Sequence, residues 1–313
     1  MKQEQKTKSR RWIAFGIVLF CAGMAAAARW DLQINLALYD PKNPIAVAFE
    51  CFGYYVQYVP VLLWWLCLAA DAGQELWVRC VMGVLTAGGA VALGANTYSG
   101  LTARGAAMPG LWCAAVWALL LLGGALLLQA RVQRARLEFA FGWAFVLMLA
   151  NNVIINVLKL IWNRTRFDDM LAAGSFADFT AWMHPFGNGG TSFPSGHTAA
   201  ACGIFVLVLL CDVLPAWNRH RTAVWGVCWA YIGSMAFNRI VIGRHFFSDT
   251  LMAAFTIALL FLLMTHTKLY RRTLARLCAD GAASESTQAS PENRCGELHP
   301  GAQGAAPTKQ DGR

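Results

Sequence analysis

The sequence predicts an all-helical membrane bundle, and three observations support this fold class. First, 57% of the 313 residues are hydrophobic and only 14% are charged, which is far from the composition of a soluble protein. Second, apolar stretches long enough to cross a bilayer, which takes about 20 residues, recur along the chain. Third, most basic residues gather in alternate connections between those stretches, as they do in multi-spanning membrane proteins.

About eight apolar stretches are candidates for membrane-spanning helices. In chain order they are residues 12–28, 51–70, 80–99, 108–130, 139–158, 195–213, 222–238 and 250–266. The first has an alternative interpretation as a cleavable signal peptide, because basic residues precede it and alanines end it. The predicted topology of the later spans is the same in both cases.

These stretches divide the chain into four parts. Residues 1–11 are a basic N-terminus, and residues 12–130 hold the N-terminal transmembrane helices. Residues 131–276 form a second set of transmembrane helices, which carries the polar motifs discussed below. Residues 277–313 are rich in Ala, Gly, Ser, Glu, Pro and Gln and have almost no large apolar side chains, so we expect a disordered cytoplasmic tail.

The distribution of Lys and Arg predicts a cytoplasmic N-terminus. With eight spans, the basic clusters near residues 2–11, 131–136, 219–221 and 268–276 all fall on the cytoplasmic side, as the positive-inside rule requires. A second group of cations falls on the opposite face and breaks the rule: Lys159, Arg164, Arg166, Arg239 and Arg244. This group needs a functional explanation.

The composition also argues against other classes of protein. The net charge of +9 does not indicate nucleic-acid binding, because the basic residues are spread over short loops and do not form one stripe. The ten cysteines show no CxxC pair, so neither a disulfide framework nor a zinc site is indicated. His184 and the nearby loop acids Asp168, Asp169 and Asp178 match no familiar ligand spacing, and we expect no metal and no cofactor.

The first polar motif is a pair of cations at the end of the 139–158 stretch. Lys159 and Arg166 enclose six residues, so both can point toward a single anion. Arg presents a planar fork that matches pairs of phosphate oxygens, and Lys acts as a compact point charge. Taken alone, the pair is also explained by long cationic side chains that reach the membrane interface.

The second motif, Pro194-Ser195-Gly196-His197, stands at the start of the 195–213 stretch. Proline suits the first turn of a helix, and Ser195 supplies a hydroxyl group. Gly196 allows the backbone to approach a phosphate at the helix N-terminus. His197 lies in the first turn of the same helix.

The third motif joins Arg239, His245 and Asp249 between the last two spans. His245 and Asp249 are four residues apart, so on one helical face the carboxylate can accept a proton from one imidazole nitrogen. The other nitrogen is then free to attack, which is the arrangement of a nucleophile and the group that orients it. A His and an Asp at this spacing also occur by chance.

In this order and on one face, the three motifs resemble the signature of the type 2 phosphatidic acid phosphatase (PAP2) family, K-x6-R-P, P-S-G-H and S-R-x5-H-x3-D. The resemblance covers about residues 139–266 and implies a six-helix core. It implies that His245 attacks phosphorus, that Asp249 orients His245, and that His197 protonates the leaving oxygen. It further implies a phosphate site made by Lys159, Arg166, Ser195, Gly196 and Arg239.

Two positions depart from the family signature. Phe167 stands where the family has proline after the first arginine, and Asn238 stands where it has serine before Arg239. Neither replaces a catalytic group. We expect the departures to affect loop shape, and with it substrate choice, more than the reaction.

The resemblance implies a membrane lipid phosphatase that works without a metal through a phosphohistidine intermediate. Its substrate would be a lipid phosphate monoester or diphosphate, and its site would face the periplasm or the cell exterior from the cell (inner) membrane. A phosphotransferase with the same intermediate is an alternative, and an anion transporter is a weaker one. The sequence indicates neither the lipid nor the oligomeric state.

Overall fold

The computed structural model describes residues 2–102, 110–131, 134–187 and 189–288. Within these residues the chain forms helices and connecting turns and no strand, which confirms the all-helical fold class. The elements in chain order are α1 (Lys2–Leu38), α2 (Pro44–Phe52), η1 (Tyr55–Gln57), α3 (Val59–Ala69), α4 (Leu76–Thr102), α5 (Gly110–Arg131), α6 (Arg134–Trp162), α7 (Phe167–Ala172), α8 (Gly196–Ala201), η2 (Cys202–Phe205), α9 (Val206–Val213), α10 (Pro215–Asn218), α11 (Arg221–Val241), α12 (Phe247–His266) and α13 (Lys268–Gln288).

Five helical segments of the described chain are long and apolar enough to cross a membrane, and a bent pair would make a sixth. The five are Ile13–Leu38, Leu76–Thr102, Arg134–Ala172, Gly196–Val213 and Phe247–His266, and the pair is Pro44–Gln57 with Val59–Ala69, bent by 42°. Where they are described, the eight expected stretches fall largely within helices. The difference in number arises because α11 does not meet the same criterion and the apolar part of α5, Trp112–Leu126, is short.

The first helix is longer than the sequence predicted. We expected the first span to end near residue 28, but α1 continues without a break to Leu38. Asp31 and Asn35 are four residues apart, so they share one face of the helix. Both are buried and hydrogen-bonded inside the protein, so these polar side chains do not end the helix.

The start of the expected C-terminal tail is also helical. α13 continues to Gln288, past residue 277 where we expected disorder to begin. Alanines at positions 279, 282 and 283 favour this extension, because alanine has the highest helix propensity. Residues 289–313 of the expected tail lie outside the described residues.

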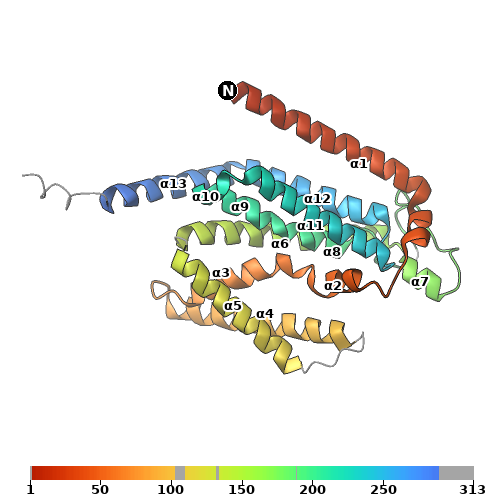
Figure 1. The fold of residues 1–313 in the computed structure, drawn as a ribbon, viewed down its shortest axis with the longest axis horizontal. Coiled ribbons are helices and arrows are strands. Elements are labelled where there is room, and N and C mark those ends of the chain that lie inside the picture. Colours follow the sequence, from red (N-terminus) through yellow and green to blue (C-terminus); the bar gives the residue numbers. More distant parts are fainter. Residues whose placement is uncertain (1, 103–109, 132–133, 188, 289–313) are drawn as a thin grey trace, which may run out of the picture.

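The helices that carry the motifs form the centre of the bundle. α6, α8, α9, α11 and α12 lie alongside one another, with α1 on one side and the α4–α5 pair on the other (Figure 1). Their inward faces form the main hydrophobic core, which includes Phe205, Ile232 and Phe261. Ring contacts connect the helices, such as Phe205 with Phe261 at 4.8 Å between centroids.

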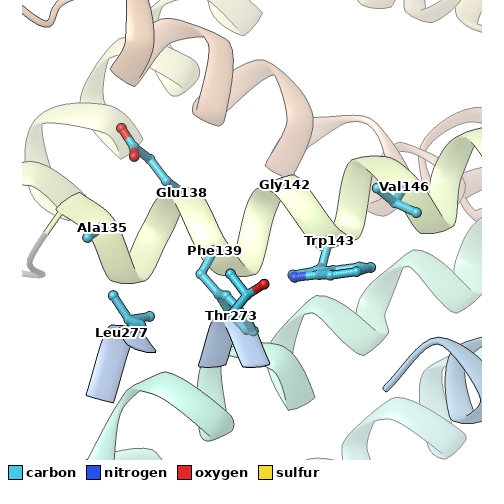
Figure 2. A pocket seen from close by; sticks show the side chains of 8 residues that line it. All are labelled: Ala135, Glu138, Phe139, Gly142, Trp143, Val146, Thr273 and Leu277. Carbon is cyan, nitrogen blue, oxygen red and sulfur yellow. The ribbon is translucent and has the colours of Figure 1, made fainter. Parts of the chain in front are cut away.

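A hollow of about 330 Å³ lies between the first part of α6 and α13. Figure 2 shows Phe139 and Trp143 of α6 beside Thr273 and Leu277 of α13. At 1.5 Å of rise per residue, Phe139 lies roughly 30 Å along α6 from Lys159. This hollow is therefore separate from the polar motifs.

The short helix α8 is held against η1 by a close backbone approach. A Cβ atom added to Gly203, just after α8, would lie 2.5 Å from the Cα atom of Gln57, so only glycine fits there. The amide of Asn151 on α6 donates to the Gln57 side chain and, over 3.0 Å, to the Ala199 carbonyl. These contacts fix the start of α8 relative to α6.

Candidate active site

The three polar segments meet at one end of the bundle. The C-terminal end of α6, the N-terminal end of α8 and the α11–α12 connection lie on the same side of Figure 1, close to α7. Backbone hydrogen bonds join them. Ser195 N donates to Asp249 O over 3.0 Å, and Ser192 N donates to Arg164 O over 2.9 Å.

Three cations from the first and third motifs gather in this region. Lys159 lies close enough to Arg166 and Arg239 for electrostatic interaction. A Cβ atom added to Gly196 would lie 3.3 Å from Lys159 Nζ, so the ammonium group sits over the first turn of α8. Cations this close repel one another, and an anion bound among them would relieve the repulsion.

Neighbouring side chains hold two of these cations in place. Arg166 Nη2 donates to Thr191 Oγ1 over 2.9 Å, and Arg166 Nε is buried without a hydrogen-bond partner. Arg239 is almost fully buried, and its Nη1 lies 3.4 Å from Glu50 Oε1 on α2. The sequence does not single out Glu50, because this residue is far from the three motifs in the chain.

Asp168, one of the loop acids, forms an ion pair with Arg244 at the edge of the site. Arg244 Nη1 lies 2.9 Å from Asp168 Oδ2, and Arg244 Nε lies 3.4 Å from Glu50 Oε1. No group of three His, Cys, Asp or Glu side chains suited to a metal ion occurs in the described part of the chain. Asp168 is thus engaged with a cation at the edge of the site.

Ser195 is the N-cap residue of α8. Its Oγ accepts from Thr198 N over 3.3 Å and from Thr198 Oγ1 over 3.0 Å. This side-chain cap satisfies one of the free amides of the first turn. The hydroxyl proton of Ser195 is still available to donate to an anion at the helix N-terminus.

His245 is buried, and its Nδ1 lies 2.7 Å from the carbonyl oxygen of Ser192. A carbonyl only accepts, so Nδ1 carries a proton, and in the neutral ring Nε2 then keeps its lone pair. Sequence analysis predicted that Asp249 would accept this proton directly, but Asp249 Oδ2 is 3.6 Å from Nδ1, beyond hydrogen-bond range. The Ser192 carbonyl takes that role because the loop before α8 passes beside the imidazole, which the sequence spacing does not reveal.

Both oxygen atoms of the Asp249 carboxylate accept hydrogen bonds. Its Oδ2 accepts from Ser192 Oγ over 2.5 Å and from Phe246 N over 2.8 Å. Its Oδ1 accepts from Arg164 Nη1 over 2.7 Å. The side chain of Arg164 is only 1% exposed, so this pair is shielded from water.

Arg164 also pairs with a second carboxylate, on Asp31 of α1, over 3.1 Å. From the sequence, Arg164 was one of the unexplained outer cations, and Asp31 lay between the first two expected spans. One signal was available, since ionisable residues beside apolar spans tend to be paired and functional. The partners themselves are more than 130 positions apart in the chain and could not be matched by spacing.

His197 lies beside the same cluster. It is near enough to His245, Arg239 and Lys159 to interact with them electrostatically. Its ring meets the Tyr54 ring edge-on, with 4.7 Å between centroids. The structure therefore brings all the residues expected at the site to one end of the bundle.

The two departures from the family signature are buried. Phe167 packs against Tyr39, Phe176 and Phe246, with ring centroids 5.2 to 6.3 Å apart. Aromatic packing thus anchors α7 where the signature has a proline. Asn238 donates to the Ser234 carbonyl within α11 over 2.7 Å.

Burial lowers the pKa of His245 from its usual value near 6.5 to about 4, with Arg239 acting in the same direction and Asp249 opposing it. We therefore predict that His245 stays neutral from pH 8 down to pH 5. NMR titration of histidine-labelled protein in micelles tests this, with the His245→Ala variant identifying the signal. The Arg239→Gln variant should titrate at a higher pH, because a nearby cation is removed. A wild-type signal that titrates near pH 6.5 would contradict the prediction.

Comparison with known proteins finds similarity to a solved structure and to one family model. The chain is similar to a solved transmembrane PAP2 type phosphatidylglycerolphosphate phosphatase from Bacillus subtilis, with 20% identity, a TM-score of 0.33 and coverage of 77% of this chain and 94% of that one. No curated protein matches the chain. The model of the PAP2 superfamily matches residues 140–273, which contain all three motifs. Over this segment, the chain is similar to the PAP2 superfamily.

Proposed function

We propose that the protein is a membrane lipid phosphatase that transfers phosphate from a lipid to His245 and then to water. One observation carries this proposal most strongly: a buried imidazole, held at Nδ1 by the Ser192 carbonyl so that Nε2 is left for attack, lies in the same cluster as Lys159, Arg166 and Arg239. The match of residues 140–273 to the PAP2 superfamily model supports phosphatase chemistry. The apolar helices around the site support a substrate that resides in the membrane.

In the first step, His245 Nε2 attacks phosphorus and the bond from phosphorus to the lipid oxygen breaks. His197, which enters this step in its protonated form, donates a proton to that oxygen, so the lipid leaves as an alcohol or, from a diphosphate, as a monophosphate. The three cations, with Ser195 and the Gly196 amide, hold the phosphoryl oxygens and neutralise their charge. Asp249, 3.6 Å from Nδ1, stabilises the positive charge that develops on the imidazole ring.

In the second step, water attacks phosphorus and the bond from phosphorus to Nε2 breaks. His197 accepts the proton from water, which restores both histidines to their starting states. Side-chain cations supply the charge that a divalent metal supplies in many phosphoryl-transfer enzymes, so we propose a metal-independent reaction.

Two other functions use the same residues differently. A phosphotransferase would pass the phosphoryl group from His245 to a second lipid in place of water. An anion transporter would use the cations but would not need the pair of histidines. The products formed from a labelled substrate distinguish the three.

We predict that His245→Ala lowers phosphate release by roughly a thousandfold or more, because the nucleophile is lost. Asp249→Asn should leave slow residual activity, since only the orientation and charge stabilisation of His245 suffer. Acid quenching with a ³²P-labelled lipid should trap an acid-labile phosphoprotein in the wild type and none in His245→Ala. Rapid turnover by His245→Ala would disprove the mechanism, and transfer of label to an added lipid would indicate a phosphotransferase.

An apolar groove beside the site suits the hydrocarbon part of a lipid. It has a volume of about 340 Å³ and lies between α3 and α4, with Tyr54, Trp65 and Ala92 among its lining residues. Tyr54 also touches His197, the proposed donor to the leaving group. A lipid could therefore place its phosphate among the cations and its chain in this groove.

We predict that long-chain lipid phosphates react much faster than glycerol phosphate in mixed micelles, because chain binding helps to position the phosphate. Suitable substrates are phosphatidate, phosphatidylglycerol phosphate, a lipid A phosphate and a polyprenyl diphosphate. Ala92→Phe should fill the groove and slow the long-chain reaction about tenfold, the effect of losing roughly two buried methylenes at about 0.8 kcal/mol each. Glycerol phosphate should be unaffected by this change. Equal rates for the lipid and glycerol phosphate in the wild type would contradict the lipid assignment.

We further propose that the site faces the non-cytoplasmic side of the cell membrane. The opposite end of the bundle carries the Arg219 and Arg221 connection and the start of α13, which are rich in Lys and Arg. The positive-inside rule places that end in the cytoplasm. The site cations are then an exception that phosphate binding explains.

Two engineered cysteines test this orientation. Phe186, in the loop after α7, is 80% exposed, and Asn218, at the end of α10, is exposed at the other end of the bundle. We predict that an impermeant thiol reagent labels Phe186→Cys in intact cells or spheroplasts and labels Asn218→Cys only after lysis. The unsubstituted chain, with its own cysteines, gives the background. The reverse pattern would place the site in the cytoplasm.

A further inference from the structure

A carboxylate outside the three motifs reaches the catalytic segment from the first helix. Asp31 on α1 has a fully buried side chain, although it precedes the segment matched by the superfamily model. Its Oδ1 accepts from Ser248 N over 3.0 Å, and its Oδ2 accepts from Ser248 Oγ over 2.5 Å. Asp31 therefore holds the first turn of α12, the turn that contains Asp249.

Arg164 connects Asp31 to Asp249. Its Nη2 donates to Asp31 Oδ2 over 3.1 Å and its Nη1 to Asp249 Oδ1 over 2.7 Å. The guanidinium carbon lies 4.1 Å from the centroid of the Phe246 ring and 5.4 Å from that of Phe179. A guanidinium held by two carboxylates and two aromatic faces has little freedom to move.

The charges in this cluster do not cancel. One buried cation, Arg164, lies between two carboxylates, so the cluster as a whole is negative when both carboxylates are ionised. Without Asp31, Arg164 and Asp249 would neutralise each other. With Asp31 present, the negative charge of Asp249 remains available to the imidazole of His245, 3.6 Å away.

We propose that Asp31 is a positioning residue of the hydrolytic site, which acts through Arg164 to orient Asp249 and to preserve its negative charge toward His245. The inference rests on the proposed function of His245 as nucleophile. If Asp31 has this role, α1 contributes a residue that orients the catalytic groups.

Other contacts of α1 support this role. Asn35, one turn after Asp31, donates from Nδ2 to the His245 carbonyl over 3.1 Å. Gly23 lets α1 approach α12 closely, because a Cβ atom there would lie 2.5 Å from Leu251 Cδ2. α1 therefore contacts the His245–Asp249 segment in two ways, through the His245 backbone and through the Arg164 ion cluster.

The test is the kinetics of Asp31→Asn, which keeps the shape of the side chain and removes its charge. We expect kcat to fall roughly ten- to a hundredfold, as is usual for residues that orient a reacting group, while KM changes less than about threefold. Asp40→Asn is the matched control, because it removes an exposed carboxylate just beyond the end of α1. The control should keep wild-type kcat.

A double-mutant cycle shows whether Asp31 acts through Asp249. If it does, adding Asp31→Asn to Asp249→Asn should lower kcat by less than about threefold further. A purely structural role would give effects that multiply, and this result would overturn the proposal. Wild-type kcat in Asp31→Asn would overturn it too.

A second variant covers the case in which Asp31→Asn does not fold because Arg164 is left poorly compensated. The double change Asp31→Asn with Arg164→Gln removes both charges, and Asp249 keeps its hydrogen bonds from Ser192 and Phe246. This variant should fold, with a reduced kcat because Asp249 is less well oriented, and with a nearly unchanged KM. Wild-type kcat in this variant would overturn the proposal. Wild-type protein and His245→Ala are assayed alongside, so high activity in His245→Ala would identify a failure of the proposed function itself.

Discussion

The buried ion cluster around Arg164 is the interaction on which the arrangement of the site depends. A guanidinium that is 1% exposed carries a large desolvation cost, which only close carboxylates and further hydrogen bonds can offset. Asp31 and Asp249 supply those carboxylates from α1 and α12. Arg164 itself lies just after α6. Its side chain therefore connects α1, α6 and α12, which are distant in sequence.

The location of this cluster explains how a short connection can hold a reactive histidine. His245 lies between α11 and α12, in a segment with no regular hydrogen-bonding pattern of its own. The Ser192 carbonyl holds its ring, Asn35 holds its backbone, and Asp249 is fixed nearby. Such preorganisation matters because phosphoryl transfer depends mainly on positioning and charge stabilisation.

The charges of the site must favour a neutral His245 before phosphate transfer and a positively charged ring after it. The cations Lys159, Arg166 and Arg239 favour an anion, and together with burial they favour a neutral His245. Once phosphorylated, the ring becomes positive and needs a carboxylate near it. The negative cluster of Arg164 with two aspartates lies on the Nδ1 side of the imidazole and meets that need, while Nε2 is left for phosphate.

The sequence by itself determined the helical membrane fold, the three motifs and the resemblance to the PAP2 superfamily, because apolar length and motif spacing are local properties of the chain. It could not show that α1 continues past Asp31, or that the Ser192 carbonyl and not Asp249 accepts the His245 proton. It also could not show that Phe167 replaces a proline by packing against other aromatic rings. Only the tertiary structure decided these points, since each depends on which distant segments come within a few ångströms of one another. Asp31 and Arg164 are the clearest case, because a buried charge is tolerated only beside a partner that folding brings to it.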